Sequence, residues 1–307
     1  MQVVALAGGI GAARFLAGLV RVVDPSALTV VANTGDDLVV HGLRISPDLD
    51  TICYTLGGGA DPEQGWGRAG ETLTVSTELR ERYGRPDWFT LGDRDLATHL
   101  VRSEILAGGG TPSEAAAAIA AAWGLGLRLL PMTDDTVATR IRTADGRDLH
   151  FQEWWIRERG EPRVAAVRLD GADAARPAPG VLEAMAAADA VLLCPSNPVV
   201  SIGTILAVPG IRDALVDPTV VGVSPIVGGR VVRGMADRLL PAAGAGTSAA
   251  GVAGLYADFL DGWVMDRADE GAAPALEARG LRVAVTDTIM RTPAVAEDVA
   301  RAALALC

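Results

Sequence analysis

Short runs of β-branched and aliphatic residues alternate with longer, alanine- and leucine-rich segments along this chain. The apolar runs span residues 2–7, 28–33, 190–194, 219–223 and 282–286. Parallel strands produce this rhythm, because each return to the start of the sheet needs a crossover that is usually a helix. The pattern therefore predicts an α/β fold with a doubly wound, mainly parallel, Rossmann-like sheet.

Residues 51–176 interrupt this rhythm, and we expect them to form a helical and β-hairpin insertion within a single domain of residues 1–307. Two helical segments come first, and the second opens on the helix-start pattern Thr-Pro-Ser-Glu at 111–114. Alternating runs then flank Ala-Asp-Gly-Arg at 144–147, which indicates a hairpin. We expect this insertion to form one wall of the active-site cleft.

The composition narrows the class of protein. Half of the 307 residues are hydrophobic, which allows a large core and excludes a disordered chain. A net charge of -11, with no lysine, argues against an extended nucleic-acid or membrane surface. Cys53, Cys194 and Cys307 lack metal or disulfide spacing, and no apolar stretch is long enough to span a bilayer. We therefore expect a cytoplasmic protein that acts on small molecules.

The first apolar run leads into Gly-Gly-Ile-Gly-Ala-Ala-Arg at residues 8–14. Glycines let a backbone approach an anion, and the following helix supplies aligned N–H groups. A dinucleotide fingerprint would have a third glycine at Arg14, so an NAD-dependent oxidoreductase is the less favoured alternative. We interpret Gly8, Gly9, Gly11 and Arg14 as phosphate-binding, against the simpler alternative of a tight strand-to-helix turn.

Three further predicted strands end in loops of glycine, serine, asparagine or threonine, at 33–37, 195–204 and 224–229. Open α/β sheets bind ligands outside the carboxyl ends of their strands. Four such loops on one edge predict a nucleotide or polyphosphate pocket. The candidate ligands in these three loops are Asn33, Ser196, Asn197, Ser201, Gly203, Ser224 and Gly228.

Carboxylates lie close to the first of these loops. Asp36 and Asp37 precede Asp48 and Asp50 by about a dozen residues. Mg²⁺ takes one or two carboxylates together with waters and phosphate oxygens. We predict a Mg²⁺ site at Asp37 and Asp50. The alternative is that Asp48 and Asp50 cap the following helix, which suits Asp48 better than Asp50.

The stretch "LGDRDLATH" contributes Arg94 as a candidate phosphate or substrate ligand, while His99 is a weaker candidate for an acid or base. This stretch and several others resemble the 2-phospho-L-lactate transferases of coenzyme F420 biosynthesis (CofD/FbiA type). They run in order to about residue 240, and more loosely to the end: "AGGIGAARFLAGL", "VANTGDD", "SPDLDTICYTLGG", "WGRAGET", "LGDRDLATHLVR", "LLPMTDD", "HFQEWW", "CPSNPVVSIGTIL" and "SPIVGG".

The resemblance implies a transfer reaction. An enolpyruvyl- or lactyl-diphospho-5'-guanosine would donate its phosphoenolpyruvyl or 2-phospholactyl group to the deazaflavin Fo, with release of GMP and a requirement for Mg²⁺. The family's Fo-contacting aspartate and arginine correspond to Asp50 and Arg94, which are the expected catalytic residues. The resemblance also implies a homodimer. The arginine-rich composition suggests a high-GC actinobacterium and hence the enolpyruvyl donor.

A non-enzymatic alternative comes from a related group of regulatory proteins that share the glycine loop and bind nucleotide sugars. The segments "SPDLDTICYTLGG" and "LGDRDLATH" are complete in this chain and favour the transferase.

Overall fold

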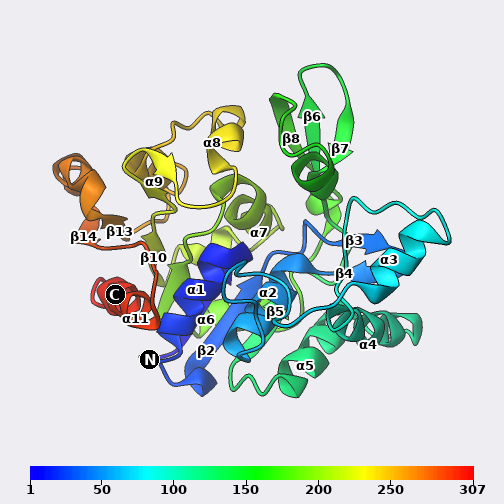
Figure 1. Cartoon of the computed structure of the whole chain (residues 1–307). Helices are drawn as coiled ribbons and strands as arrows, with labels where there is room; N and C mark the ends of the chain where they lie inside the picture. The colour runs from blue at the N-terminus through cyan, green and yellow to red at the C-terminus, as the bar shows by residue number, and fades with distance from the viewer.

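A central sheet of seven parallel strands organises the computed structural model, which describes residues 1–307 (Figure 1). The strand order is β14-β13-β10-β9-β1-β2-β5. The strands are β1 (Val3–Ala7), β2 (Leu28–Ala32), β5 (Arg128–Pro131), β9 (Ala190–Leu193), β10 (Thr219–Val223), β13 (Gly262–Asp266) and β14 (Arg282–Thr286). The chain winds outward in one direction from β1 to β5 and in the other from β9 to β14. The doubly wound Rossmann-like prediction is therefore confirmed.

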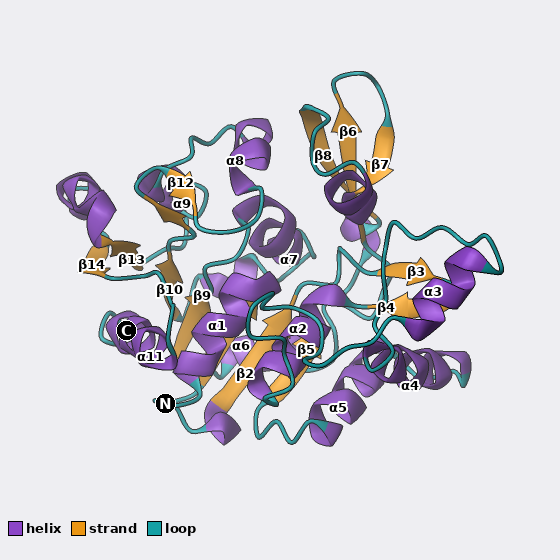
Figure 2. Ribbon diagram, in the orientation of Figure 1, coloured by secondary structure: helices purple, strands orange, loops and turns teal.

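Helices cover both faces of this sheet (Figure 2). Val3, Ala5 and Ala7 pack with one set of helices, whereas Val4 and Leu6 pack on the opposite face. The first set comprises α1 (Gly9–Leu19), α2 (Pro47–Leu56), α5 (Pro112–Ala122) and α11 (Pro293–Leu304). The opposite face carries α6 (Val181–Ala186), α7 (Gly203–Leu206), α8 (Ala236–Leu239), α9 (Ala249–Gly254) and α10 (Ala273–Glu277). Burial on both faces explains why β1 is a continuous apolar run.

The predicted hairpin is confirmed at 144–147, where β6 (Ala138–Thr143) pairs antiparallel with β7 (Asp148–His150). The strand β8 (Val164–Asp170), absent from the prediction, joins β6 as a third strand. This small sheet stands clear of the central sheet, at the top of Figure 1. The helix start at 111–114 is also confirmed, because Thr111 and Glu114 form a complete capping box.

The range 51–176 differs from the expected insertion in one respect, because it supplies β5 to the edge of the central sheet. Thr29 to Ala32 of β2 pair in parallel with Arg128 to Pro131. The helices α3 (Thr74–Glu81) and α4 (Asp95–Ala107) also belong to this region. The short strands β3 (Leu38–Val40) and β4 (Leu43–Ile45) come just before it in the chain. A strand at the edge of a sheet can be only a few residues long, so the short stretch Arg128–Pro131 is sufficient to form β5. None of the helices is both long and apolar enough to cross a membrane.

Candidate active site

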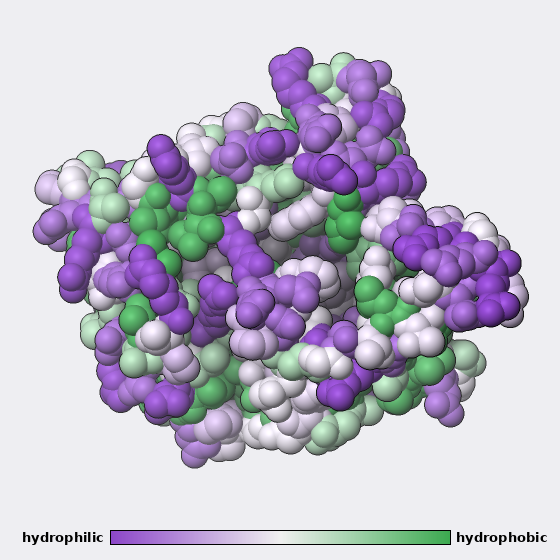
Figure 3. All heavy atoms as spheres, in the orientation of Figure 1, coloured by the Kyte–Doolittle hydropathy of each residue, from purple (hydrophilic) through white to green (hydrophobic).

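Between β1 and β9 the chain switches from adding strands on one side of the sheet to adding them on the other. The loops that follow these two parallel strands touch. The backbone N–H of Gly8 donates a hydrogen bond of 3.0 Å to Oγ of Ser196. A Cβ on Gly8 would lie 2.7 Å from Cβ of Ser201 and 2.8 Å from Oδ2 of Asp48, so only glycine fits. In doubly wound sheets this switch point forms the ligand crevice. Figure 3 shows that the corresponding face is hollowed near its centre and bordered by hydrophilic side chains.

Helix α1 starts inside this crevice, and the amide of Gly9, its first residue, donates to the carboxylate of Asp48. The N-cap of α1 is Gly8, which offers no side-chain acceptor, and its first turn contains no acidic residue. Gly9 has φ of 72°, in the left-handed region that glycine tolerates. A Cβ on Gly11 would overlap the carbonyl oxygen of Pro195, which makes Gly11 a packing requirement. The N–H groups of α1 therefore form a typical anion-binding end.

Asp48 lies against the glycine loop, a position that its reading as a helix cap did not anticipate. Its Oδ2 accepts a hydrogen bond of 2.9 Å from Nδ2 of Asn33, whose Oδ1 accepts from the Gly35 amide. Burial raises the pKa of Asp48 to about 6, and the hydrogen bonds from Asn33 and Gly9 offset part of that effect. Asn33 thus shapes the loop and positions a carboxylate beside the N-terminal end of α1.

Several other predicted ligands use their polar groups within their own loops. Oδ1 of Asn197 accepts from the amides of Val199 and Val200, and Oγ of Ser224 bonds to the backbone of Ile226. The amide of Gly228 donates to Asp269 at 2.9 Å. Gly203 packs closely, because a Cβ there would lie 2.8 Å from the Pro198 carbonyl. These contacts show why each loop has its shape, and the ligand roles stay predictions.

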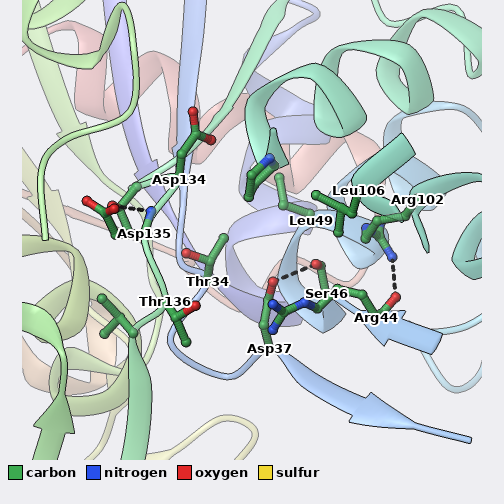
Figure 4. Close-up of a pocket in the computed structure, with 13 residues that line it drawn as sticks. Thr34, Asp37, Arg44, Ser46, Leu49, Arg102, Leu106, Asp134, Asp135 and Thr136 are labelled. Carbon is green, nitrogen blue, oxygen red and sulfur yellow. Dashed lines mark hydrogen bonds between the residues drawn. The ribbon is translucent and has the colours of Figure 1, made fainter. Parts of the chain in front are cut away.

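A small polar pocket lies where β2 and β5 end (Figure 4). Its volume is about 40 Å³. The polar side chains of its lining are Thr34, Asp37, Arg44, Ser46, Arg102, Thr133, Asp134, Asp135 and Thr136. Oδ2 of Asp37 accepts a hydrogen bond of 2.7 Å from Ser46, and burial raises the pKa of Asp37 to about 7. A space of this size holds a water molecule or an ion rather than a nucleotide.

Asp36, next to Asp37, is buried at the same edge. Burial, and then the charges of Asp48 and Asp37, raise the pKa of Asp36 well above its ordinary value. Oδ1 of Asp36 and Oδ1 of Asp37 are both buried without a hydrogen-bond partner. Buried oxygens of this kind are costly unless a cation, a proton or a donor satisfies them.

Asp50 forms a buried ion pair with Arg102 of α4. Both carboxylate oxygens accept from the guanidinium, Oδ2 at 3.1 Å, and the two side chains are only 6% and 4% exposed. His99 continues the network, with Nδ1 3.6 Å from Asp50 and Nε2 3.0 Å from Asp95. Burial acts to lower the pKa of Arg102, but the charge and hydrogen bonds of Asp50, together with the charge of Asp37, raise that pKa overall. The geometry therefore gives Asp50 a charge-balancing partner within the protein.

Arg94 is exposed at the start of α4. Its amide donates to Glu71 at 2.8 Å and its guanidinium donates to the carbonyl of Ala69 at 3.2 Å. Glu71 also accepts from the amide of Asp95, so this glutamate caps the helix. The structure does not bring Arg94 into contact with Asp50, and their predicted catalytic roles remain predictions.

Comparison with known proteins identifies the family. The family model for 2-phospho-L-lactate transferase CofD matches residues 3–299. The chain belongs to this family. It is 52% identical over 313 residues to a phosphoenolpyruvate transferase of Kitasatospora aureofaciens, covering 100% of this chain and 98% of that protein. It is also 53% identical to one from Thermobifida fusca, with 96% of each chain covered.

A solved structure of a UPF0052 family protein from Bacillus halodurans has the same fold. Its TM-score is 0.66 at 16% sequence identity, and 99% of this chain and 98% of that chain are covered. This likeness bears on the fold alone, whereas the transferase assignment rests on the family model and the relatives.

The buried carboxylates of this CofD-family chain include candidates to hold the Mg²⁺ that the resemblance implies. No three or more His, Cys, Asp or Glu side chains are grouped to hold a metal ion. Mg²⁺ does not require such a cage, since it is commonly held by one or two carboxylates and substrate phosphates. The unpartnered oxygens of Asp36 and Asp37 fit that donor set. The oxygens of Asp50 already accept from Arg102, so the geometry supports Asp37 over Asp50 as a ligand.

Sequence reasoning did not single out Asp36, Asp48 or Arg102 as site residues. A helix advances by about 100° per residue, so Asp48 and Asp50 necessarily point to different sides of α2. The sequence contains that signal, but it does not say which side faces the glycine loop.

Proposed function

We propose that this chain transfers the phosphoenolpyruvyl group of enolpyruvyl-diphospho-5'-guanosine to the deazaflavin Fo and releases GMP, with 2-phospholactyl as the other donor group. The supporting observation is the N-terminus of α1 at the β1/β9 switch point, where the N-cap Gly8 offers no side-chain acceptor and Ser196 and Asp48 lie beside it. That crevice suits a diphosphate. The relatives that carry the name phosphoenolpyruvate transferase favour the enolpyruvyl donor.

The chemistry is a displacement at phosphorus. The terminal ribityl hydroxyl of Fo forms a bond to the phosphorus that carries the enolpyruvyl group, and the bond from that phosphorus to the oxygen of GMP breaks. The hydroxyl proton goes to solvent, and GMP leaves with the bonding electron pair. Transfer of this kind depends mainly on positioning and on neutralising charge.

The residues of the chain supply these effects in the proposed reaction. The first amides of α1 face the diphosphate and stabilise charge as it develops on the leaving phosphate. Asp36 and Asp37 would hold Mg²⁺, which when bound neutralises phosphate oxygens. Arg94, exposed at the start of α4, is proposed to contact Fo.

To test the proposal, the purified protein is incubated with Fo, Mg²⁺ and each donor in turn, and the product is identified by mass spectrometry. We expect Fo to gain the phosphoenolpyruvyl group and GMP to appear in equal amount. Arg94→Ala should weaken Fo binding, followed by deazaflavin fluorescence, while the exposed Arg142→Ala should not. A protein that yields no product from either donor, and binds a nucleotide sugar but not Fo, would be regulatory. Light scattering tests the proposed homodimer.

A further inference from the structure

Two arginines from distant parts of the chain meet beside the glycine loop. Arg14 belongs to α1, and Arg233 follows the short strand β12 (Arg230–Val231). A Cβ on Gly65 would lie 3.2 Å from Nη1 of Arg233 and 3.4 Å from Nη2 of Arg14. Both guanidinium groups therefore lie beside Gly65, and these two nitrogens are within about 7 Å of each other.

No carboxylate balances these charges. Neither Arg14 nor Arg233 forms an ion pair, and Arg14 donates no hydrogen bond to any protein atom. Burial and the like charge of Arg233 lower the pKa of Arg14. Arg233 is exposed and Arg14 is partly buried, so solvent screens their repulsion, and an anion bound between them would remove it.

The pair also lies within reach of the crevice. Arg14 is five residues beyond Gly9 on α1, which is roughly 7 Å along the helix axis. An extended arginine side chain spans a comparable distance. A ligand with an oxyanion bound at the N-terminus of α1 can therefore also contact the guanidinium groups.

A simpler role for Arg233 is to tether the loop above α1. Its Nη2 donates to the carbonyl of Gln64, next to Gly65. That contact uses one of the five N–H donors of a guanidinium, and the others have no protein acceptor. A tether alone does not explain why a second, unpaired arginine is placed opposite.

We propose that Arg14 and Arg233 form a clamp for an oxyanion of the donor, and that Arg233 is a binding residue of this transferase. The assignment of the ligand rests on the proposed function, because that donor carries both a diphosphate and a carboxylate. Both groups present the paired oxygens that a guanidinium recognises. The nearby N-terminal end of α1, whose N-cap Gly8 offers no side-chain acceptor, favours the diphosphate as the group held.

Calorimetric titration of Arg233→Ala with GDP, GMP and phosphoenolpyruvate tests the clamp. A charge-assisted hydrogen bond contributes about 1.5–3 kcal/mol, so we expect a 10- to 100-fold loss of affinity for an anionic ligand. A loss for GDP that exceeds the loss for GMP assigns the clamp to the diphosphate. A loss confined to phosphoenolpyruvate assigns it to the carboxylate end of the donor, and the clamp stands.

Arg230→Ala is the matched control, because Arg230 is exposed on the same short hairpin and forms no ion pair. Arg233→Lys should recover only part of the affinity, since an ammonium cannot bind two oxygens in parallel. Unchanged affinity of Arg233→Ala for all three ligands would overturn the clamp. Binding by the unmodified protein and transfer to Fo are measured separately, so failure of the clamp differs from failure of the proposed reaction.

Discussion

Replacing Arg102 with methionine tests whether the Asp50–Arg102 pair holds α2 and α4 together. The substitution keeps most of the side-chain volume but leaves the Asp50 carboxylate buried, with His99 as its nearest remaining partner at 3.6 Å. Removing one member of a buried ion pair costs about 3–5 kcal/mol, because the other charge stays desolvated. We expect Arg102→Met to lower the free energy of unfolding by that amount.

Urea unfolding followed by circular dichroism measures this loss, with an unchanged m-value as the sign of an intact native state. The double variant Asp50→Asn/Arg102→Met removes the stranded charge and should be more stable than Arg102→Met alone. Arg142→Met, at an exposed position of β6 without an ion pair, should stay within about 0.5 kcal/mol of the unmodified protein. A loss below about 1 kcal/mol in Arg102→Met, or no recovery in the double variant, would refute the reasoning.

Three further predictions follow from the carboxylates and the glycine loop. Burial raises the pKa of Asp37 from 3.8 to about 7, so the native state binds the extra proton and stability falls as pH rises between those values. At pH 8 in EDTA, Asp37→Asn should therefore have a higher melting temperature than the unmodified protein. A difference in melting temperature that does not shrink towards pH 4 would contradict the raised pKa of Asp37 as its cause. Mg²⁺ at 100 times its Kd should stabilise the protein by about 2.7 kcal/mol, and an equal effect in Asp36→Asn/Asp37→Asn would exclude these ligands. Gly11→Ala should destabilise by about 1–3 kcal/mol through overlap with the Pro195 carbonyl, whereas Gly254→Ala, which has open space in α9, should not; equal melting temperatures would disprove the overlap.

The sequence predicts the strands that are β-branched and aliphatic runs, including the edge strand β14, but it misses the inner strand β13 and the other edge strand, β5. The strands β1, β2, β9 and β10 are runs dominated by aliphatic residues, because both of their faces are buried. The strand β13 escaped prediction because Gly-Trp-Val-Met-Asp contains one β-branched residue and directly follows a helical segment. The strand β5 escaped because its leucines resemble the neighbouring helix more than a strand.

The site divides along a similar line. The sequence singles out residues whose proposed role depends on the backbone, since glycines after a strand have a local physical meaning, and their ligand roles stay predictions. Residues whose role depends on tertiary packing were not. The orientation of Asp50 towards Arg102 depends on α4 packing against α2, which neither segment specifies by itself.

The position of β1 between β2 and β9 has a consequence for folding. Val3 pairs with Leu28 on one side and with Ala190 on the other, so one neighbour of β1 is synthesised early and the other much later. Contacts between residues so far apart in sequence form slowly. The loops after β1 and β9 meet only when both strands are paired, so the ligand crevice cannot exist until about two-thirds of the chain has left the ribosome. Until then β1 presents one unpaired edge, which exposes the nascent chain to aggregation.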